Sequence, residues 1–221
     1  RGTRREGRLG LFLPERKQRL ELKVKVPRKV IDPLKPCEVD GFLNGIHRYR
    51  DLSIILVMLF CGLRTQEVIN LRIQDVDFQQ SQMKVHGKGK KQRFLPLPYR
   101  LMQLFEKYLS YERPNDGADC FFVVLQGASE GKRMTSAGIR SLFRYRRQIT
   151  QIKRARPHQF RHAFASDMAR AGVPLTTIQR LLGHSDPATS EIYIELFLDD
   201  IRADYDSAME RIKTRYAAIP T

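Results

Sequence analysis

His158 and Arg161, in the segment PHQFRHAFASDM, have the residue types and the spacing that suit a bound phosphate group. Residues three apart share one face of a helix, and Pro157 fits the first position of such a helix. A histidine and an arginine near a helix start are well placed for an anion. His158 and His162 could instead bind zinc together with His184, but the glutamate of a metalloprotease helix is missing. We therefore expect phosphate chemistry and no metal.

A second basic group stands at an expected helix start, in the segment GLRTQEVINL. Arg64 follows an apolar helix and Gly62, and its guanidinium could bind two phosphate oxygens at once. Taken alone, an arginine at such a place is more often an ordinary surface residue. The segment GKGKKQR, residues 87–93, is typical of a hairpin tip whose lysines reach phosphates or base edges, or are simply solvated.

The most specific segment is IQRLLGHSDPATSEIYIEL. His184 follows the helix-ending Gly183, and Tyr193 lies in the helix expected next, where a tyrosine is by itself more often a core or surface residue. Considered together, two arginines, two histidines, a lysine and a tyrosine suffice for phosphoryl transfer without metal, because the cations neutralise charge on the phosphate oxygens. A phenol with its usual pKa near 10 needs such neighbours to act as a nucleophile.

The composition favours nucleic acid as the partner. The chain has 221 residues, a formal net charge of +16 and a pI of about 10.1. A domain this basic repels itself unless it binds an anion, and nucleic acid is favoured over an acidic membrane surface. The apolar stretch Ile54–Cys61 is too short to span a bilayer, and no signal peptide follows the basic N-terminus. Three cysteines without a CxxC pair argue against a disulfide framework and for a reducing cytosol.

The chain is expected to be mainly α-helical, with a small antiparallel β-hairpin. Met83, Val85 and Phe94 alternate around a turn at Gly87–Gly89, and CFFVVL, residues 120–125, reads as a buried strand or an extended core segment. Apolar periodicity, with prolines at helix starts and glycines at helix ends, defines the helices. They are expected at about residues 38–46, 50–60, 98–111, 135–149, 157–171, 174–182 and 198–216, with two more beginning near Thr65 and Pro187.

In chain order, the singled-out residues resemble those of the tyrosine recombinase (phage integrase) family. The order is arginine, lysine, His-x-x-Arg, histidine and tyrosine, carried by GLRTQEV, HGKGKKQRFLPLP, HQFRHAFAS and LLGHSDPATSEIYIEL. These segments are closest to the Xer-like branch and to integrases of mobile elements, and the similarity covers about residues 36–216. The resemblance implies the catalytic-domain fold of that family, which is mainly α with a small antiparallel sheet.

The resemblance also implies an activity, the site-specific integration or excision of DNA. Tyr193 would attack the scissile phosphate, forming a 3′-phosphotyrosine and freeing a 5′-hydroxyl, while Arg64 and Arg161 hold the non-bridging oxygens. The 5′-hydroxyl of a second strand would reverse the step and exchange the strands. Because the bond energy stays in the phosphotyrosine, neither a metal nor ATP nor another cofactor is implied.

The remaining site residues are assigned by the same resemblance. Lys88, with Lys90 as the runner-up, would protonate the leaving oxygen. His158 would assist proton transfer from the tyrosine, His184 would hydrogen-bond the phosphate, and Glu67 would orient part of the site. Further basic residues are expected to contact DNA: Lys90, Lys91, Arg93, Arg140 and Arg144.

The ends of the chain are expected to serve other contacts. Residues 1–36 carry twelve basic and four acidic residues, a net charge of +8, and read as a basic arm that connects residues 37–221, the catalytic domain, to a missing N-terminal DNA-binding domain. Residues 195–210 instead hold six acidic residues and one basic residue. In the family this C-terminal segment docks on a neighbouring subunit in a tetramer on DNA; capping its own chain is the alternative. The setting implied is the bacterial cytoplasm, near the nucleoid.

Three other functions compete with this interpretation. A type IB topoisomerase would use the same chemistry but reseal the same strand as a monomer. A basic DNA-binding regulator would grip phosphates without catalysis, so that losing the Tyr193 hydroxyl would change nothing. An RNA-binding domain ranks last, because the aromatic runs typical of RNA recognition are missing.

Overall fold

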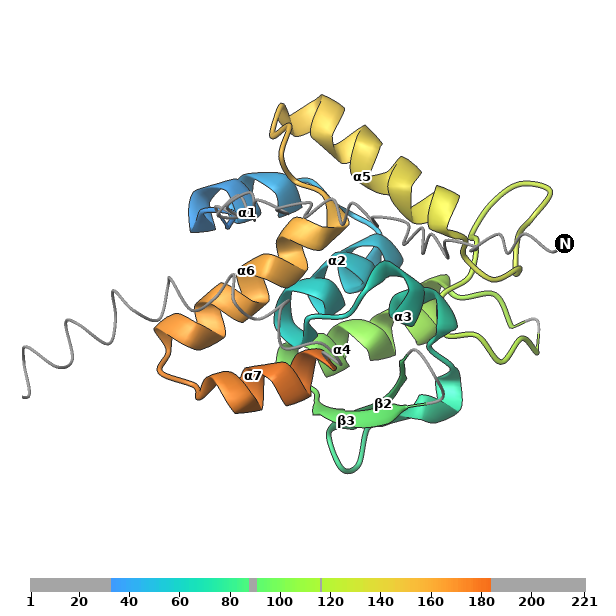
Figure 1. Cartoon of the computed structure of the whole chain (residues 1–221). Helices are drawn as coiled ribbons and strands as arrows, with labels where there is room; N and C mark the ends of the chain where they lie inside the picture. The colour runs from blue at the N-terminus through green and yellow to red at the C-terminus, as the bar shows by residue number, and fades with distance from the viewer. Residues whose placement is uncertain (1–32, 88–90, 116, 184–221) are drawn as a thin grey trace, which may run out of the picture.

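A computed structural model describes residues 33–87, 91–115 and 117–183, and it confirms the mainly α class with a small antiparallel sheet (Figure 1). None of the helices in these ranges is long and apolar enough to cross a membrane. The elements, in chain order, are α1 (Pro36–Leu43), α2 (Tyr49–Cys61), α3 (Thr65–Asn70), η1 (Ile73–Asp75), β1 (Val76–Asp77), β2 (Gln82–His86), β3 (Gln92–Pro96), α4 (Tyr99–Lys107), the π-helical turn η3 (Tyr108–Glu112), α5 (Ser136–Thr150), α6 (Pro157–Arg170) and α7 (Leu175–Leu182).

Helix α2 forms the centre of the fold because most of its side chains are apolar and buried, from Ile54 to Leu59. It packs against α6 on one side and α4 on another. It ends at Gly62, which adopts a left-handed conformation with φ of 63°. A Cβ atom at this position would lie 2.5 Å from Phe164 Cδ1 and 2.8 Å from Leu182 Cδ2, so α6 and α7 close directly over the glycine.

Replacing Gly62 with alanine is therefore expected to lower the free energy of unfolding by about 3 kcal/mol, from left-handed strain and overpacking together. Gly45 is a matched control, since its φ is 73° but no atom lies within 4 Å of an added Cβ. Gly45→Ala should cost only about 1 kcal/mol. Urea denaturation of both variants measures the difference, and equal losses would contradict the close packing of α6 and α7 on Gly62.

The sheet has the strand order β1-β2-β3, and both pairs are antiparallel. Met83 pairs with Leu95, and all three of Met83, Val85 and Leu95 are buried, as the alternation predicts for the first two. The alternation fails at Phe94, which pairs with Lys84 on the opposite face and is 62% exposed. The short strand β1 was not predicted.

Two aromatic clusters fix the helices around α2. Phe42, Phe143 and Phe160 bring α1, α5 and α6 together, with ring centroids 5.2 to 5.6 Å apart. Phe105 and Phe121 lie in a second cluster, with ring centroids 4.7 Å apart. Phe121 belongs to the segment CFFVVL, which is an extended core segment: Cys120–Val123 is buried but forms only isolated bridges to Arg72 and Arg133.

Most predicted helix boundaries agree with the structure within two residues. The helix predicted over 98–111 stops at Lys107 and continues as the π-helical turn. The three cysteines, all within the described ranges, are free thiols. The helices predicted around Tyr193 and over 198–216, and the arm over 1–36, lie outside the described residues.

Candidate active site

Glu67 stands at the centre of the candidate site, in the first turn of α3. Arg64 is the N-cap residue of this helix, and its backbone N–H donates to Glu67 Oε2 at 2.9 Å. The Arg64 side chain turns back onto the same carboxylate, with Nη1 3.1 Å from Oε1. The Glu67 side chain is only 5% exposed, so it acts inside the fold, while the Arg64 side chain is 38% exposed and reaches the surface.

Arg93, on β3, forms a bidentate ion pair with the same carboxylate. Its Nη1 lies 2.8 Å from Glu67 Oε1 and its Nη2 lies 2.9 Å from Oε2. Its Nε donates to the carbonyl oxygen of Leu181 at 2.7 Å. Arg93 was predicted as a DNA contact; its guanidinium lies in this internal ion pair, with 13% of the side chain exposed.

Arg161, on α6, approaches from the other side and is buried. It donates through Nη1 to the carbonyl oxygen of Gly62 and through Nη2 to that of Leu182, the latter at 2.7 Å. Its Nη1 lies 3.7 Å from Glu67 Oε2. Arg161 therefore joins the loop after α2 to the end of α7, and it faces the fold interior, whereas His158, predicted to share its face, is exposed.

The three arginines meet at the C-terminal end of α7. Carbonyl groups in a last helical turn lack partners within the helix, and positive charge is favourable there. Leu181 binds Arg93, and Leu182 binds Arg161 and also Arg64, the last at 3.3 Å. Gly183 ends the helix with φ of 63°. The arginines thus fix the point from which the chain leads on to position 184.

One carboxylate faces three guanidinium groups, which leaves a formal excess of two positive charges. Burial raises the pKa of Glu67, but the hydrogen bond and charge of Arg93, followed by Arg64 and Arg161, outweigh it, so the pKa lies below its usual value. Glu67 is therefore ionised at neutral pH, and its one negative charge cancels only one of the three positive charges. A positive site of this kind can bind phosphate oxygens.

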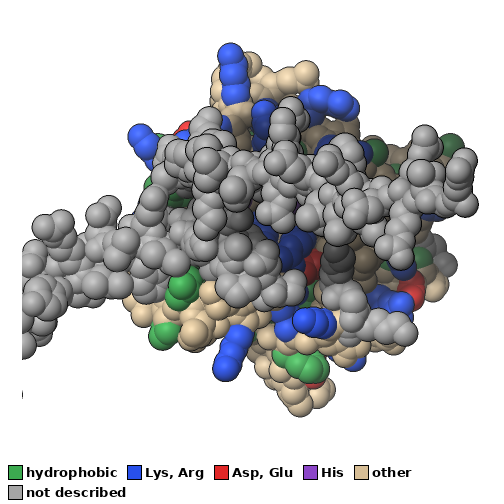
Figure 2. Space-filling model, viewed as in Figure 1, with side chains coloured by type: hydrophobic (Ala, Val, Ile, Leu, Met, Phe, Trp, Pro, Cys, Tyr) green, Lys and Arg blue, Asp and Glu red, His purple; other side chains and the backbone are tan. Residues whose placement is uncertain are grey.

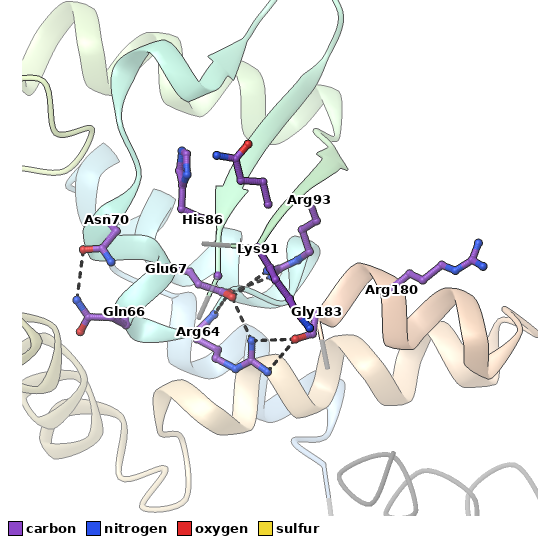
Figure 3. A pocket seen from close by; sticks show the side chains of 11 residues that line it. Arg64, Gln66, Glu67, Asn70, His86, Lys91, Arg93, Arg180 and Gly183 are labelled. Atoms are coloured by element: carbon purple, nitrogen blue, oxygen red, sulfur yellow. Dashed lines mark hydrogen bonds and ion pairs between the residues drawn. The ribbon is translucent and has the colours of Figure 1, made fainter. Parts of the chain in front are cut away.

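The cluster opens into a cavity of about 750 Å³ between α3, the β2–β3 hairpin and the end of α7 (Figure 3). Lys91 and Gly87 line it from the hairpin, and Gln66 and Asn70 line it from α3. Figure 2 shows Lys and Arg side chains around the middle of this face of the molecule, with acidic side chains among them.

His86 also lines this cavity, and the sequence reasoning missed it. Its Nε2 lies 2.9 Å from Oδ1 of the buried Asp75. The available signal was its position directly before the glycine-rich tip, which places it at the end of β2 next to the turn. The signal was weak, because Asp75 is eleven residues away and its contact depends on how η1 meets the sheet.

The two histidines of α6 differ in environment. His158 is exposed, whereas His162 is partly buried. Burial, assisted by the positive charges of His158 and Arg161, lowers the pKa of His162 to about 4, so that it is neutral at pH 7. Among the described residues, no group of three or more His, Cys, Asp or Glu side chains could hold a metal ion.

The structure brings Arg64, Glu67 and Arg161 together and adds Arg93 to them. Arg140 and Arg144 are exposed on α5, which Figure 1 shows on the side of the molecule away from the hairpin. Four predicted site residues lie outside the described ranges: Lys88, Lys90, His184 and Tyr193.

Comparison with known proteins gives a consistent result. Residues 34–198 match the profile of the Phage integrase family. A tyrosine recombinase of Pseudothermotoga lettingae is 34% identical over 176 residues, which are 78% of this chain and 59% of that protein. Tyrosine recombinase XerC of Pseudomonas fluorescens is 33% identical over 207 residues, or 92% and 66% of the two chains. The chain thus spans about three fifths to two thirds of these relatives' lengths.

Solved structures show the same fold. The XerA recombinase superposes with a TM-score of 0.66 at 27% identity, over 85% of this chain and 66% of that chain. The XerH site-specific recombinase, in a post-cleavage complex with a palindromic difH substrate, gives a TM-score of 0.66 at 23% identity, over 83% and 54%.

Proposed function

This chain belongs to the phage integrase family, and from that premise we propose that it is the catalytic domain of a site-specific tyrosine recombinase. It would cut one DNA strand, hold the end as a 3′-phosphotyrosine, and pass it to the 5′-hydroxyl of another strand. Relatives named tyrosine recombinases support this activity.

The observation that carries the proposal is the arginine cluster. Arg64 and Arg161 are 97 positions apart in the sequence, yet both bind the carbonyl oxygen of Leu182 and both lie at Glu67. Arg64 lines the cavity together with Glu67 and Arg93, and the buried Arg161 lies behind it at Glu67, so the cluster brings excess positive charge to one place. Phosphoryl transfer needs such charge where negative charge builds on the phosphate oxygens.

In the proposed mechanism, the Tyr193 oxygen bonds to phosphorus as the bond to the 5′ oxygen breaks. His158 takes the phenolic proton, and Lys88, or else Lys90, gives a proton to the leaving oxygen. His184 hydrogen-bonds the phosphate held by Arg64 and Arg161. Support comes from the sequence neighbours: Gly87 and Lys91 flank the lysines and line the cavity, and Gly183, which precedes His184, lines it as well.

The proposed partner is double-stranded DNA at a specific site. The XerH complex with its difH substrate supports this partner. Exposed Lys91, Arg140 and Arg144 would contact the DNA backbone, together with Lys90.

The two ends of the chain would serve other contacts. We further propose that residues 1–36 connect residues 37–221 to an N-terminal DNA-binding domain, and that residues 198–216 dock on a neighbouring subunit in a tetramer. The protein would act on DNA in the bacterial cytoplasm, at the nucleoid. The bacterial relatives support that setting.

A covalent-trapping experiment tests the activity without knowledge of the target site. The full chain is incubated with a pool of duplexes of random sequence, each nicked so that cleavage releases a short 5′-hydroxyl fragment that diffuses away. Adducts that survive denaturation are recovered and their DNA is sequenced. Trypsin then releases residues 181–202, a peptide with one tyrosine and one histidine, and mass spectrometry locates the nucleotide.

The proposal requires an acid-stable nucleotide on Tyr193 and a shared sequence among the trapped duplexes. A linkage to another residue would overturn the assignment of Tyr193 as the nucleophile. A pool that yields no adduct although the protein binds DNA would overturn the proposed activity and favour a DNA-binding regulator. Relaxation of supercoiled plasmid by a monomer, without strand exchange between two recovered sites, would favour the topoisomerase.

A further inference from the structure

Arg93 connects three parts of the candidate site that are far apart in the sequence. We propose that Arg93 is a positioning residue: it holds Glu67 and the end of α7 in the arrangement that presents Arg64 and Arg161 to the scissile phosphate. The inference rests on the proposed function and deepens it, because it assigns to a non-catalytic residue the task of aligning the catalytic ones.

The strand register directs the Arg93 side chain inward. Arg93 pairs with Val85 across β2 and β3, and directly paired residues project from the same face of a sheet. Val85 is buried, with 1% of its surface exposed. The Arg93 side chain therefore runs along the core face and reaches α3 and α7, rather than the solvent.

The contacts at the end of the Arg93 side chain depend on the planar shape of its guanidinium group. Two nitrogens of Arg93 match the two oxygens of Glu67 (Figure 3). The third nitrogen donates to the carbonyl oxygen of Leu181 at the end of α7. Lysine carries its charge on a single nitrogen and cannot reproduce this fork and the third bond together. Without Arg93, the buried Glu67 carboxylate would still have Arg64 at 3.1 Å and Arg161 at 3.7 Å as charged neighbours. The carboxylate could then rotate toward these two arginines.

Close packing at Gly183 is an independent sign of the same role. A Cβ atom added at Gly183 would lie 2.8 Å from Arg93 Nη1 and 3.2 Å from its Cζ. The guanidinium is thus seated directly against the backbone at the point where the chain continues to His184. A residue that orients the arginines and also supports this backbone can affect several catalytic groups at once.

Burial separates Arg93 from the basic residues that are free to contact DNA. Its side chain is 13% exposed and paired, whereas Lys91, two residues earlier on the hairpin, is exposed. Loss of a phosphate contact weakens binding and reduces its salt dependence. Loss of alignment instead slows the chemical step, and a misplacement of about 1 Å can cost about 10²-fold in rate.

The test compares Arg93→Gln and Arg93→Lys in the full chain, using a nicked duplex recovered by the trapping experiment. We expect the single-turnover cleavage rate to fall about 10²-fold in both, with unchanged affinity for the intact duplex. Lys91→Gln should show the opposite split, with weaker binding and a nearly normal rate. Arg170→Gln is the matched control, because Arg170 is an exposed arginine paired with Asp167 on α6, and it should match the wild type.

Coupling to Glu67 completes the test. If Arg93 acts through this carboxylate, adding Arg93→Gln to the Glu67→Gln variant should lower the cleavage rate little further. The effects of substitutions within one network are not additive. Weaker DNA binding with a normal rate would overturn the positioning role, and so would a rate loss that merely follows the folded fraction in thermal denaturation. If wild type and Arg170→Gln form no Tyr193 adduct, it is the proposed function that fails.

Discussion

Tyr193→Phe is expected to abolish covalent adduct formation, with a cleavage rate at least about 10⁴-fold below that of the wild type. The substitution removes only the phenolic oxygen, the atom proposed to bond to phosphorus, and keeps the ring. The arginine cluster at Glu67 is unchanged by it, so binding of DNA should be unaffected. Single-turnover cleavage and affinity, measured on the same recovered duplex, give the two quantities.

Tyr145→Phe provides the matched control, because Tyr145 is 60% exposed on α5. It should cleave at the wild-type rate. Residual adduct in the Tyr193→Phe protein would point to another nucleophile. A parallel loss of DNA affinity would mean that the hydroxyl serves binding and not the chemical step.

Arg161→Ala should damage both the fold and the chemistry. The buried guanidinium binds the carbonyl oxygens of Gly62 and Leu182 and lies beside Glu67. Its removal leaves the buried carbonyl oxygens without the Arg161 donor and leaves the Glu67 carboxylate with one cation fewer. The free energy of unfolding should therefore fall by about 3–5 kcal/mol. Loss of its charge from the phosphate site should slow cleavage by about 10³-fold or more. Urea denaturation and single-turnover cleavage measure the two effects.

Arg146 offers a control with similar burial, but its hydrogen bonds go to the end of α1 and not to the Glu67 cluster. Its side chain is buried on α5 and donates to the carbonyl oxygen of Phe42, with Nη2 at 2.7 Å. Arg146→Ala should cost comparable stability, yet under conditions where the protein is folded it should cleave normally. If Arg146→Ala and Arg161→Ala lose cleavage equally at matched folded fractions, Arg161 has only a structural role.

Local signals in the sequence determined most element boundaries and the outline of the site. Pro157 begins α6, Gly62 and Gly183 end α2 and α7, and Arg64 with Glu67 starts α3. These features act over three or four residues, because they concern unpaired backbone groups at helix ends and the glycine conformations that satisfy them. The order of Arg64, His158 and Arg161 also pointed to the family to which the chain belongs.

The tertiary structure alone decided how the basic residues are used. Arg93 and Glu67 are 26 residues apart, and Arg64 and Leu182 are 118 apart, so no local pattern specifies these contacts. Strand register turned Arg93 inward and left Phe94 exposed. In the sequence every arginine of a basic chain looks equally available to DNA; only packing of the hairpin, α3, α6 and α7 around one carboxylate separates the buried arginines from those at the surface.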